Sequence, residues 1–407
     1  MLSPISRFLV SHGASAFATG VHLVLMAWIS IVELGLSSSQ LGWIQAAVLF
    51  PNLLLILVAG AWADRVNPAK VMVAAQLLLS CSFVSLLLLL TGGYANFVSL
   101  LIYAITVGIG QAFIQPVREK LVTQIQGSSA QKRISLLSIT QFSLQSCGMA
   151  LAALTDTVGL NGILVIQIVA SLSSCIVLAS LVKFIGDGTA NTTSGHKTAQ
   201  DIAGAVRYVI NSSGLRQLMA LIAFNGYMHM GVFLVAIPVV ATGTYRLSSS
   251  EYAWLQMLFV LGMICAHTFL LRAKLVEYPG QGALFSLLYT TLIGFALAKG
   301  PTPFGFYSLV FLWGLTAGNS AGRCRLVLQS LVVPEMKGRI MAVYQLMLFG
   351  AAPFGALVTG YLINYMSIKN IFSFMSMSSA ALFVVFLFSR TLWSIKQHVE
   401  EGDASSS

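Results

Sequence analysis

The chain has 407 residues, of which 57% are hydrophobic and only 8% are charged. Soluble globular domains carry about 25% charged residues, so this composition excludes a soluble enzyme, a collagen-like chain and a disordered chain. It also excludes an outer-membrane β-barrel, whose strands alternate polar and apolar residues, because runs such as Leu86–Leu90 are solidly apolar. A membrane-spanning helix needs about 20 apolar residues, and the sequence holds enough for roughly a dozen. We therefore predict an all-α, polytopic membrane protein.

Apolar windows that end at glycine, proline, asparagine or charged residues predict twelve membrane spans. Their expected ranges in chain order are 8–33, 39–62, 69–90, 96–117, 134–155, 161–184, 216–240, 250–271, 281–298, 304–325, 340–363 and 370–392. They form two sets of six, because the longest polar stretch of the chain separates the sixth span from the seventh.

This polar stretch divides the chain into a first six-helix bundle at 1–184, a cytoplasmic linker at 185–214 and a second six-helix bundle at 215–393. Within the linker, Thr198–Asp201 has the character of a capping box, and the residues after it are apolar at helical spacing. We expect a short amphipathic helix there, along the inner membrane surface. The tail at 394–407 is polar, so we expect it to be disordered and cytoplasmic.

The net charge of +10 is concentrated on one side of the predicted spans. If both termini are cytoplasmic, all of the 22 Lys and Arg residues lie on the inner side except Arg246, Lys299 and Lys369. Retention of Lys and Arg in the cytoplasm determines membrane orientation. We therefore predict that both termini are cytoplasmic, and we interpret the positive charge as an orientation signal and not as a sign of a nucleic-acid partner.

The five cysteines all fall within predicted spans: Cys81, Cys147, Cys175, Cys265 and Cys324. The sequence shows no disulfide framework and no Cys-x-x-Cys metal motif, and we predict no catalytic residue, no metal and no cofactor. A carboxylate near the bilayer centre would be the default ion-coupling group, but none of the twelve acidic residues lies deep in a predicted span.

Two segments at the inner ends of the fourth and tenth spans are similar. Arg118–Gln124 corresponds to Arg323–Gln329 at an offset of 205, and Arg133-Ile134 recurs as Arg339-Ile340 at an offset of 206. A period near half the chain length is typical of a duplicated six-helix unit. Coincidence of two basic clusters at helix ends is the alternative, and we favour duplication.

Two loops carry a resemblance to a known family. Gly60–Arg65, followed by Lys70, resembles the signature loop between spans two and three of the major facilitator superfamily. The run Val333–Met341, leading to Tyr344-Gln345, is similar to the loop before span eleven in the branch that contains the enterobactin exporter and macrolide efflux pumps. The resemblance covers nearly the whole chain. It implies a fold of two pseudo-symmetric six-helix halves in a bacterial inner membrane.

The sequence departs from the pattern of this family at three places. Asn67 stands where the signature loop has its second glycine, and we expect it to adopt the left-handed turn that glycine serves. Span five has Ser146–Met149 in place of the Gly-Pro pair of proton-driven antiporters. The branch places an acidic residue early in span one, whereas Ser11–Ser15 contains no carboxylate.

Histidines are the remaining titratable candidates at mid-depth, because the unperturbed pKa of histidine is about 6.5. His22 lies near the middle of the first span and His229 near the middle of the seventh, 207 positions apart, which nearly equals the repeat offset. We predict proton coupling for both; hydrogen bonding to the substrate or to a neighbouring helix is the alternative. His12 and His267 lie nearer the inner surface, and we expect them to be structural.

In this superfamily the first, fourth, seventh and tenth spans line the central cavity, so the resemblance implies that polar side chains there meet the substrate. Uncharged polar groups also avoid lipid and collect along a hydrated path. Hydrogen bonding between helices is the alternative. The predicted substrate cavity comprises Thr19, His22, Gln111, Gln115, Gln141, Asn225, His229, Trp313, Thr316, Asn319 and Gln345.

Charged residues at the inner helix ends are candidates for a gate. A carboxylate at a helix terminus can pair with an N-terminal dipole or with an arginine. We predict gating roles for Asp64, Arg65, Arg118, Arg323 and Arg339, with positive-inside flanking as the alternative.

Together these features predict a secondary active transporter that works by alternating access around a midplane cavity. No Walker motif is present, so we expect the energy to come from an ion gradient, in the first place a proton gradient. The resemblance favours export of a small organic molecule, siderophore-like or drug-like. Uptake and lysophospholipid flipping are alternatives on the same fold, and a non-transporting membrane sensor is an alternative of another class. We expect a monomer whose partners are its substrate, protons and the lipid bilayer.

Overall fold

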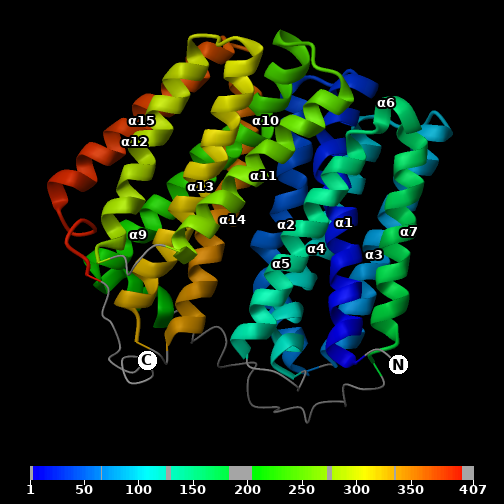
Figure 1. Ribbon diagram of the computed structural model, residues 1–407, viewed down its shortest axis with the longest axis horizontal. Coiled ribbons are helices and arrows are strands. Elements are labelled where there is room, and N and C mark those ends of the chain that lie inside the picture. The colour runs from blue at the N-terminus through cyan, green and yellow to red at the C-terminus, as the bar shows by residue number, and fades with distance from the viewer. Residues whose placement is uncertain are drawn as a thin grey trace. The chain divides into compact units, whose positions relative to one another are not determined.

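The computed structural model describes residues 3–65, 67–124, 130–182, 204–272, 277–333 and 336–396. Within these residues every long element is a helix and no strand occurs (Figure 1). This confirms the predicted all-α fold.

The first half of the chain is a series of long helices joined by short turns. In chain order they are α1 (Pro4–Trp28) with its π-helical extension η1 (Ile29–Glu33), α2 (Ser38–Arg65), α3 (Pro68–Thr91), α4 (Phe97–Gln124), α5 (Ala130–Ala152), the short α6 (Thr155–Val158) and α7 (Leu160–Ala179). Each of the first six predicted spans coincides with one of the long helices.

The second half begins with an interrupted helix. The α-helix α9 (Ser213–Phe224) passes through the π-helical turn η2 (Asn225–Met230) into α10 (Gly231–Val239), which ends in a second π-helical turn, η3 (Val240–Thr244). The later helices are α11 (Ser249–Arg272), α12 (Pro279–Ala298), α13 (Pro303–Leu331), α14 (Lys337–Leu362) and α15 (Ile368–Ser389). A helical segment therefore stands at each of the twelve predicted positions.

Nine of these segments, within the described residues, are both long enough and apolar enough to cross a membrane. The other three are α2, α5 and α13. The helix α13 has 29 residues but carries Asn319, Ser320, Arg323 and Arg325 in its second half, which reduces its mean hydropathy. The length and apolarity of the helices confirm a polytopic membrane protein.

The start of α3 shows how the local sequence sets a helix boundary. Pro68 is the first helical residue, where its missing N–H is no loss. The Asn67 side chain accepts a hydrogen bond from the Ala69 amide at 2.9 Å and so caps the helix. Asn67 has φ −52° and ψ 116°, so the prediction of a left-handed turn at this residue is wrong. The following proline pushes Asn67 toward extended backbone, where it serves as a cap.

Tight turns follow spans one, three, five, seven and nine. Each contains a residue with positive φ: Gly35, Gly93, Gly159, Arg246 and Gly300. Gly159, with φ +84° and ψ 148°, occupies backbone space that is essentially closed to residues with a Cβ. Each short connection reverses the direction of the chain, and two of them join helices that pack together, α3 with α4 and α12 with α13.

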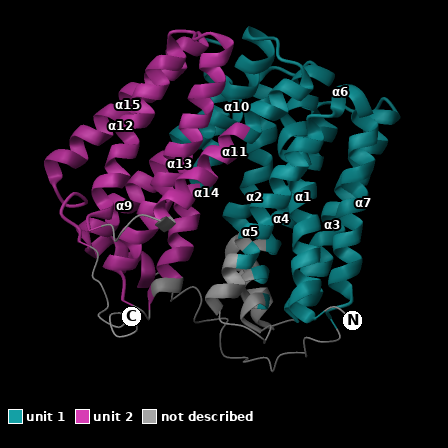
Figure 2. Cartoon of the chain, viewed as in Figure 1, with its two compact units in different colours: residues 1–199, 227–257, 349–366 teal, residues 200–226, 258–348, 367–407 magenta. Residues whose placement is uncertain are grey.

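The chain divides into two compact units that do not follow the two halves of the sequence (Figure 2). Unit 1 comprises 1–199, 227–257 and 349–366, and unit 2 comprises 200–226, 258–348 and 367–407. The turn η2 and the helices α11 and α14 each pass from one unit to the other. Segments of the second half of the sequence therefore pack with the first six spans.

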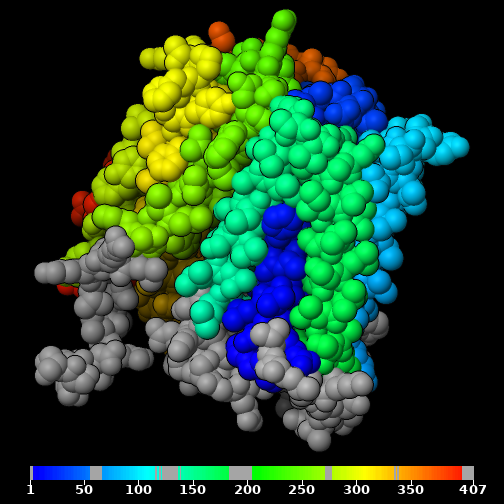
Figure 3. Space-filling model, turned by 45° about the vertical axis from the view of Figure 1, so that its right-hand side comes forward, coloured from blue at the N-terminus to red at the C-terminus, as the bar shows by residue number. Residues whose placement is uncertain are grey.

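In unit 1, α1 lies between α5 and α7 (Figure 3). Two glycines bring the backbones of α1 and α5 together: a Cβ on Gly20 would stand 2.1 Å from the Gln145 carbonyl oxygen, and one on Gly148 would stand 2.0 Å from that of Phe17. Small residues permit such close approach in membrane bundles. The helix α4 packs against both α2 and α3.

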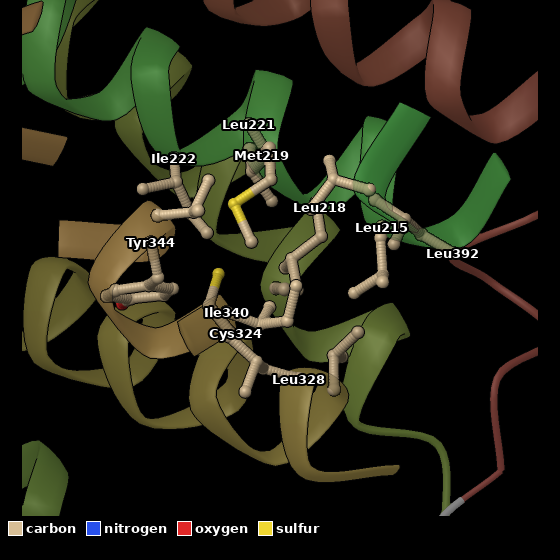
Figure 4. Packing of buried hydrophobic residues seen from close by; sticks show 14 of the residues in the cluster. Leu215, Leu218, Met219, Leu221, Ile222, Cys324, Leu328, Ile340, Tyr344 and Leu392 are labelled. Carbon is tan, nitrogen blue, oxygen red and sulfur yellow. The ribbon is translucent and has the colours of Figure 1, made fainter. Parts of the chain in front are cut away.

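In unit 2, an apolar core lies between α9, α13 and α14. Figure 4 shows Leu218 and Ile222 of α9 beside Cys324 and Leu328 of α13 and Tyr344 of α14. The helix α12 packs against both α13 and α15. This arrangement fixes the rotation of α13, because Cys324 and Leu328 point into the core.

The predicted linker helix begins outside the described residues, which resume at 204. Residues 204–211 are helical. Ala205 and Val209 are buried in the core of unit 2, whereas Val206 and Ile210 are exposed. The position of this helix along the membrane surface stays a prediction, and most of the acidic tail lies outside the described part.

Candidate functional site

His22 is held between three helices near the middle of α1. Only 3% of its surface is exposed. Its Nδ1 lies 2.9 Å from the Tyr103 hydroxyl of α4, and the rings of Phe83 on α3 and of Tyr103 flank the imidazole. A hydroxyl can donate to a neutral imidazole nitrogen or accept from a protonated one, so this bond is compatible with either protonation state.

The polar stripe that precedes His22 on α1 is largely paired. Ser15 donates to the Gln76 side-chain oxygen of α3 at 2.9 Å, and Thr19 donates to the Ser15 carbonyl at 2.9 Å. His12 is 4% exposed and stacks on Phe8, while its Nε2 has no hydrogen-bond partner within the described residues. Hydrogen bonding between helices thus accounts for Ser15, whereas Thr19 bonds only along its own helix.

Arg118 and Gln141, predicted for a gate and for the cavity, contact each other. Arg118 of α4 donates through Nη1 to the Gln141 side-chain oxygen of α5 at 2.7 Å, and both residues are half-buried. A charged donor makes a short, strong hydrogen bond of this kind. The His12 imidazole is within electrostatic range of the guanidinium. Three polar side chains from α1, α4 and α5 therefore gather at one place in unit 1.

Asn225 and His229 both lie in the π-helical turn η2. The Asn225 amide donates to the Ser320 hydroxyl of α13 at 3.2 Å. His229 is half-buried. Single π-helical turns inside α-helices are frequent at functional sites, and this one coincides with the two polar residues predicted for span seven.

On α13, the predicted residues fall into two environments. Trp313 and Thr316 are buried, and the Thr316 hydroxyl donates to the Leu312 carbonyl at 2.8 Å. Asn319 and Arg323, one turn apart, form a pair in which Arg323 Nε donates to the Asn319 side-chain oxygen at 3.0 Å. Both members of this pair are half-buried.

The remaining predicted residues have less distinctive surroundings. Gln111 of α4 and Gln345 of α14 are half-buried. Arg339 is exposed, and its Nη1 lies 3.6 Å from the Met336 sulfur. The side chains of Asp64, Arg65 and Gln115 lie outside the described part of the chain, although their backbones belong to α2 and α4.

The predicted cavity residues fall into both units. Those in unit 1 are Thr19, His22, Gln111, Gln115, Gln141 and His229, and those in unit 2 are Asn225, Trp313, Thr316, Asn319 and Gln345. Within the described part of the chain, Arg118 contacts Gln141 and Arg323 contacts Asn319. His22 is bonded to a residue outside the predicted set. The cavity as a whole stays a prediction.

Sequence reasoning missed the partners of the predicted residues. Tyr103 precedes Gln111 by eight residues, a little over two helical turns, so the polar face of the fourth span could have been extended to it. Ser286 and Gly282 of α12, which contact Asn319 and Arg323, carry no sequence signal of this role. The π-helical turn η2 also has no visible signal in the sequence.

Comparison with known proteins gives a family and a fold. The family profile described as Major Facilitator Superfamily matches residues 8–351. No curated protein sequence matches the chain. Among solved structures, the nucleoside transporter NupG is similar with a TM-score of 0.74 and 11% identity, over 95% of this chain and 99% of that one. The peptide transporter POT in complex with alafosfalin is similar with a TM-score of 0.74 and 13% identity, over 97% of this chain and 96% of that one.

A structure of proton dependent oligopeptide transporters is similar with a TM-score of 0.68 and 12% identity, over 96% of this chain and 98% of that one. Identities this low show the fold alone. The family profile, however, spans most of the chain and starts within α1. The family and the fold indicate a transporter and not an enzyme. Its long apolar helices, with polar side chains inside them, and this profile lead to one conclusion: the chain belongs to the Major Facilitator Superfamily of membrane transporters.

Proposed function

We propose that this transporter exports a small organic molecule, siderophore-like or drug-like, from the cytoplasm by alternating access, with the proton gradient as its energy source. Both termini are cytoplasmic in this proposal, because that orientation leaves nearly all Lys and Arg on the inner side. The export direction rests on the similarity of Val333–Met341 to the efflux branch. Asp64, Arg65, Arg118, Arg323 and Arg339 belong to the inner gate.

The observation that carries alternating access is a set of contacts within unit 1 between the first six spans and segments of the second half. Asp156, between α5 and α7, accepts hydrogen bonds from the Ser249 hydroxyl at 2.6 Å and from the Ser250 amide at 3.2 Å. It thereby caps the N-terminus of α11. Trp28 and Tyr252 stack with ring centroids 6.2 Å apart.

A second contact joins the start of α2 to the residues that follow α14. The Asn364 amide donates to the Ser39 hydroxyl at 3.3 Å. The helices also approach closely here, since a Cβ on Gly42 would stand 2.7 Å from the Ala356 carbonyl oxygen. Alternating access requires contacts between the halves that close one face and break when that face opens. In the proposed orientation these contacts close the outer face.

The chemistry of the polar side chains supports a polar ligand with few charges. Half-buried amides at Gln111, Asn225 and Gln345 can donate and accept hydrogen bonds. The similar solved structures include transporters of nucleosides and peptides, which are polar organic molecules of modest size. In the proposal His22 and His229 exchange the coupling protons, and Tyr103 is the hydrogen-bond partner of His22 in both states.

The test is accumulation of candidate compounds, such as a siderophore and a macrolide, in cells with and without the gene. Cells that express it should accumulate less, and a protonophore should abolish the difference. Higher accumulation in expressing cells would show uptake and overturn the direction. His22→Gln and His229→Gln should each reduce gradient-driven efflux about a hundred-fold or more, the lower end of a typical proton-transfer contribution. His267→Gln is the matched control. Unchanged efflux in both variants would contradict the proposal that His22 and His229 exchange the coupling protons.

A further inference from the structure

Arg323 is a positioned guanidinium in α13, the helix at the tenth predicted span. Its Nε donates to the Asn319 side-chain oxygen at 3.0 Å. The Asn319 amide nitrogen in turn donates to the Ser286 hydroxyl at 3.1 Å and to the Gly282 carbonyl at 3.4 Å, both on α12. The Ser286 hydroxyl donates to the same Gly282 carbonyl at 3.0 Å. The side chain that orients Arg323 is therefore itself fixed to the neighbouring helix.

Gly282 makes room for the arginine. A Cβ at this position would stand 2.1 Å from Arg323 Cδ and 2.4 Å from Cζ. The guanidinium consequently lies over Gly282, between α12 and α13. Any larger residue there would displace it.

The two terminal nitrogens of this guanidinium are available to bind a ligand. Within the described residues the only hydrogen bond of Arg323 is the one from Nε, and no carboxylate pairs with it. Arginine carries five N–H donors in a planar fork, and the two terminal nitrogens match the oxygens of a phosphate. A cation held at membrane depth needs a counter-charge, so the unused edge points to an anionic ligand.

Arg323 lies beside an exposed apolar face of α12, whereas the next residue of α13, Cys324, faces the core of unit 2. Cys324 and Leu328 of α13 point into that core (Figure 4). On α12, by contrast, Phe285, Tyr289 and Leu292 are 36%, 50% and 59% exposed. Lipid chains cover such a surface in a membrane. Tyr289 is also within electrostatic range of Arg323, so the apolar face adjoins the guanidinium.

The depth of Arg323 matches a lipid headgroup. A helix of 29 residues, such as α13, is about 43 Å long, whereas the hydrocarbon core is about 30 Å thick. Arg323 precedes the last residue of α13, Leu331, by eight residues, which is about 12 Å. With α13 centred on the hydrocarbon core, its Cα would lie roughly 6 Å inside the hydrocarbon, and a long arginine side chain reaches the interface from there.

We propose that Arg323, positioned over Gly282 between α12 and α13, binds the phosphate of an anionic phospholipid of the inner leaflet. The two terminal nitrogens of Arg323 hold the phosphate oxygens, and the acyl chain lies along Phe285, Tyr289 and Leu292. Basic pockets between membrane helices on the cytoplasmic side bind such headgroups. The leaflet assignment rests on the orientation in the proposed function, but the binding site itself does not depend on what is transported.

The test is lipid binding by the purified full-length chain, measured by native mass spectrometry after addition of phosphatidylglycerol or phosphatidylcholine. Phosphatidylglycerol should bind more tightly, and Arg323→Gln should weaken its binding about ten-fold, as expected for loss of a charged, bidentate contact. Arg325→Gln is the matched control, because it removes an equal charge two residues away, on the face that contacts Tyr344. Thermal unfolding checks that each variant is folded.

Gly282→Ala tests whether lipid binding requires the position of the Arg323 guanidinium or only its charge. It retains Arg323 but displaces it, so it should weaken phosphatidylglycerol binding nearly as much as Arg323→Gln. Equal losses in Arg323→Gln and Arg325→Gln, or no preference for phosphatidylglycerol, would overturn the site. If Arg323→Gln abolished transport of an anionic compound but left lipid binding unchanged, the guanidinium would serve the substrate and the lipid proposal would fail. Binding is measured without transport, so failure of the export proposal leaves this result interpretable.

Discussion

Four polar side chains of unit 1, Ser15, Gln76, Ser80 and Ser171, form a hydrogen-bond network across helices. Gln76 of α3 accepts from Ser15 of α1 and donates to Ser171 of α7 at 3.1 Å, and the Ser171 and Ser80 hydroxyls lie 2.7 Å apart. These residues are buried. A polar group without a partner is costly in an apolar surrounding, so this network joins α1, α3 and α7 and specifies how they are rotated.

Ser171→Ala should destabilise unit 1. The substitution leaves the Gln76 amide without its acceptor, which costs about 1–3 kcal/mol. Thermal unfolding of the purified protein in detergent should show a lower midpoint. Ser173→Ala on the same helix is the control, because Ser173 is exposed and bonds only to the Ala170 carbonyl of its own helix. Equal midpoints for the two variants would contradict a stabilising role of the network.

At the scale of single elements, two helix seams, meaning places where glycines bring two helix backbones together, occupy equivalent positions in the two halves of the sequence. Gly20 and Gly148 bring α1 and α5 together, and Gly226 and Gly355 bring the η2 segment and α14 together. A Cβ on Gly226 would stand 2.1 Å from the Leu348 carbonyl oxygen. Gly20 and Gly226 are 206 positions apart, and Gly148 and Gly355 are 207 apart, which matches the offset of the sequence repeat. The equivalent seams support duplication of a six-helix unit.

Gly148→Ala and Gly355→Ala should both loosen their seams. In each case the new methyl group would meet the backbone of the facing helix, which cannot move aside as the flexible end of a side chain can. Overpacking of this kind costs about 1–3 kcal/mol. Thermal unfolding midpoints should fall in both variants. Gly243→Ala is the control, since a Cβ there meets nothing within 4 Å. A Gly148 variant as stable as the Gly243 variant would contradict the close approach of α1 and α5.

The seventh span contains a structural feature that its sequence does not predict. Its range could be predicted from apolarity, and Asn225 and His229 could be selected as polar residues within it. The π-helical turn that contains both could not be predicted, because it depends on how the backbone accommodates α14 and α13. This turn changes which directions the two side chains take, so the one-face reasoning used for regular helices does not apply to them.

On the scale of the whole molecule, the proposed alternating access requires the contact between Ser39 and Asn364 to open and close. Ser39→Cys with Asn364→Cys, in a chain whose five native cysteines are replaced, should form a disulfide or react with a short cross-linker, because the native side chains lie 3.3 Å apart. Cross-linking should abolish transport, and a reducing agent should restore it. The measurement is substrate efflux before and after reduction.

The two single-cysteine variants are the controls for this experiment. They should retain transport under the same oxidising conditions. Normal efflux by the fully cross-linked double variant would show that this contact does not separate during the cycle, and alternating access with an outer gate at this place would be wrong.

The sequence by itself determined the class of protein, the place of each span and the polar positions within the spans. These are local properties: apolarity over about 20 residues sets a span, and proline, glycine and asparagine set its ends, although Asn67 proved to be a cap and not a left-handed turn. The polar residues could be selected because so few occur in apolar segments.

Only the tertiary structure decided what each polar residue touches. His22 contacts Tyr103, Arg118 contacts Gln141, and Arg323 lies over Gly282. Arg118 and Arg323 are equivalent in the sequence repeat, yet one reaches the following span and the other reaches the preceding one. The physical reason is that helix rotation and the gaps left by glycine on a neighbouring helix depend on packing between residues far apart in the sequence, and no local pattern encodes them.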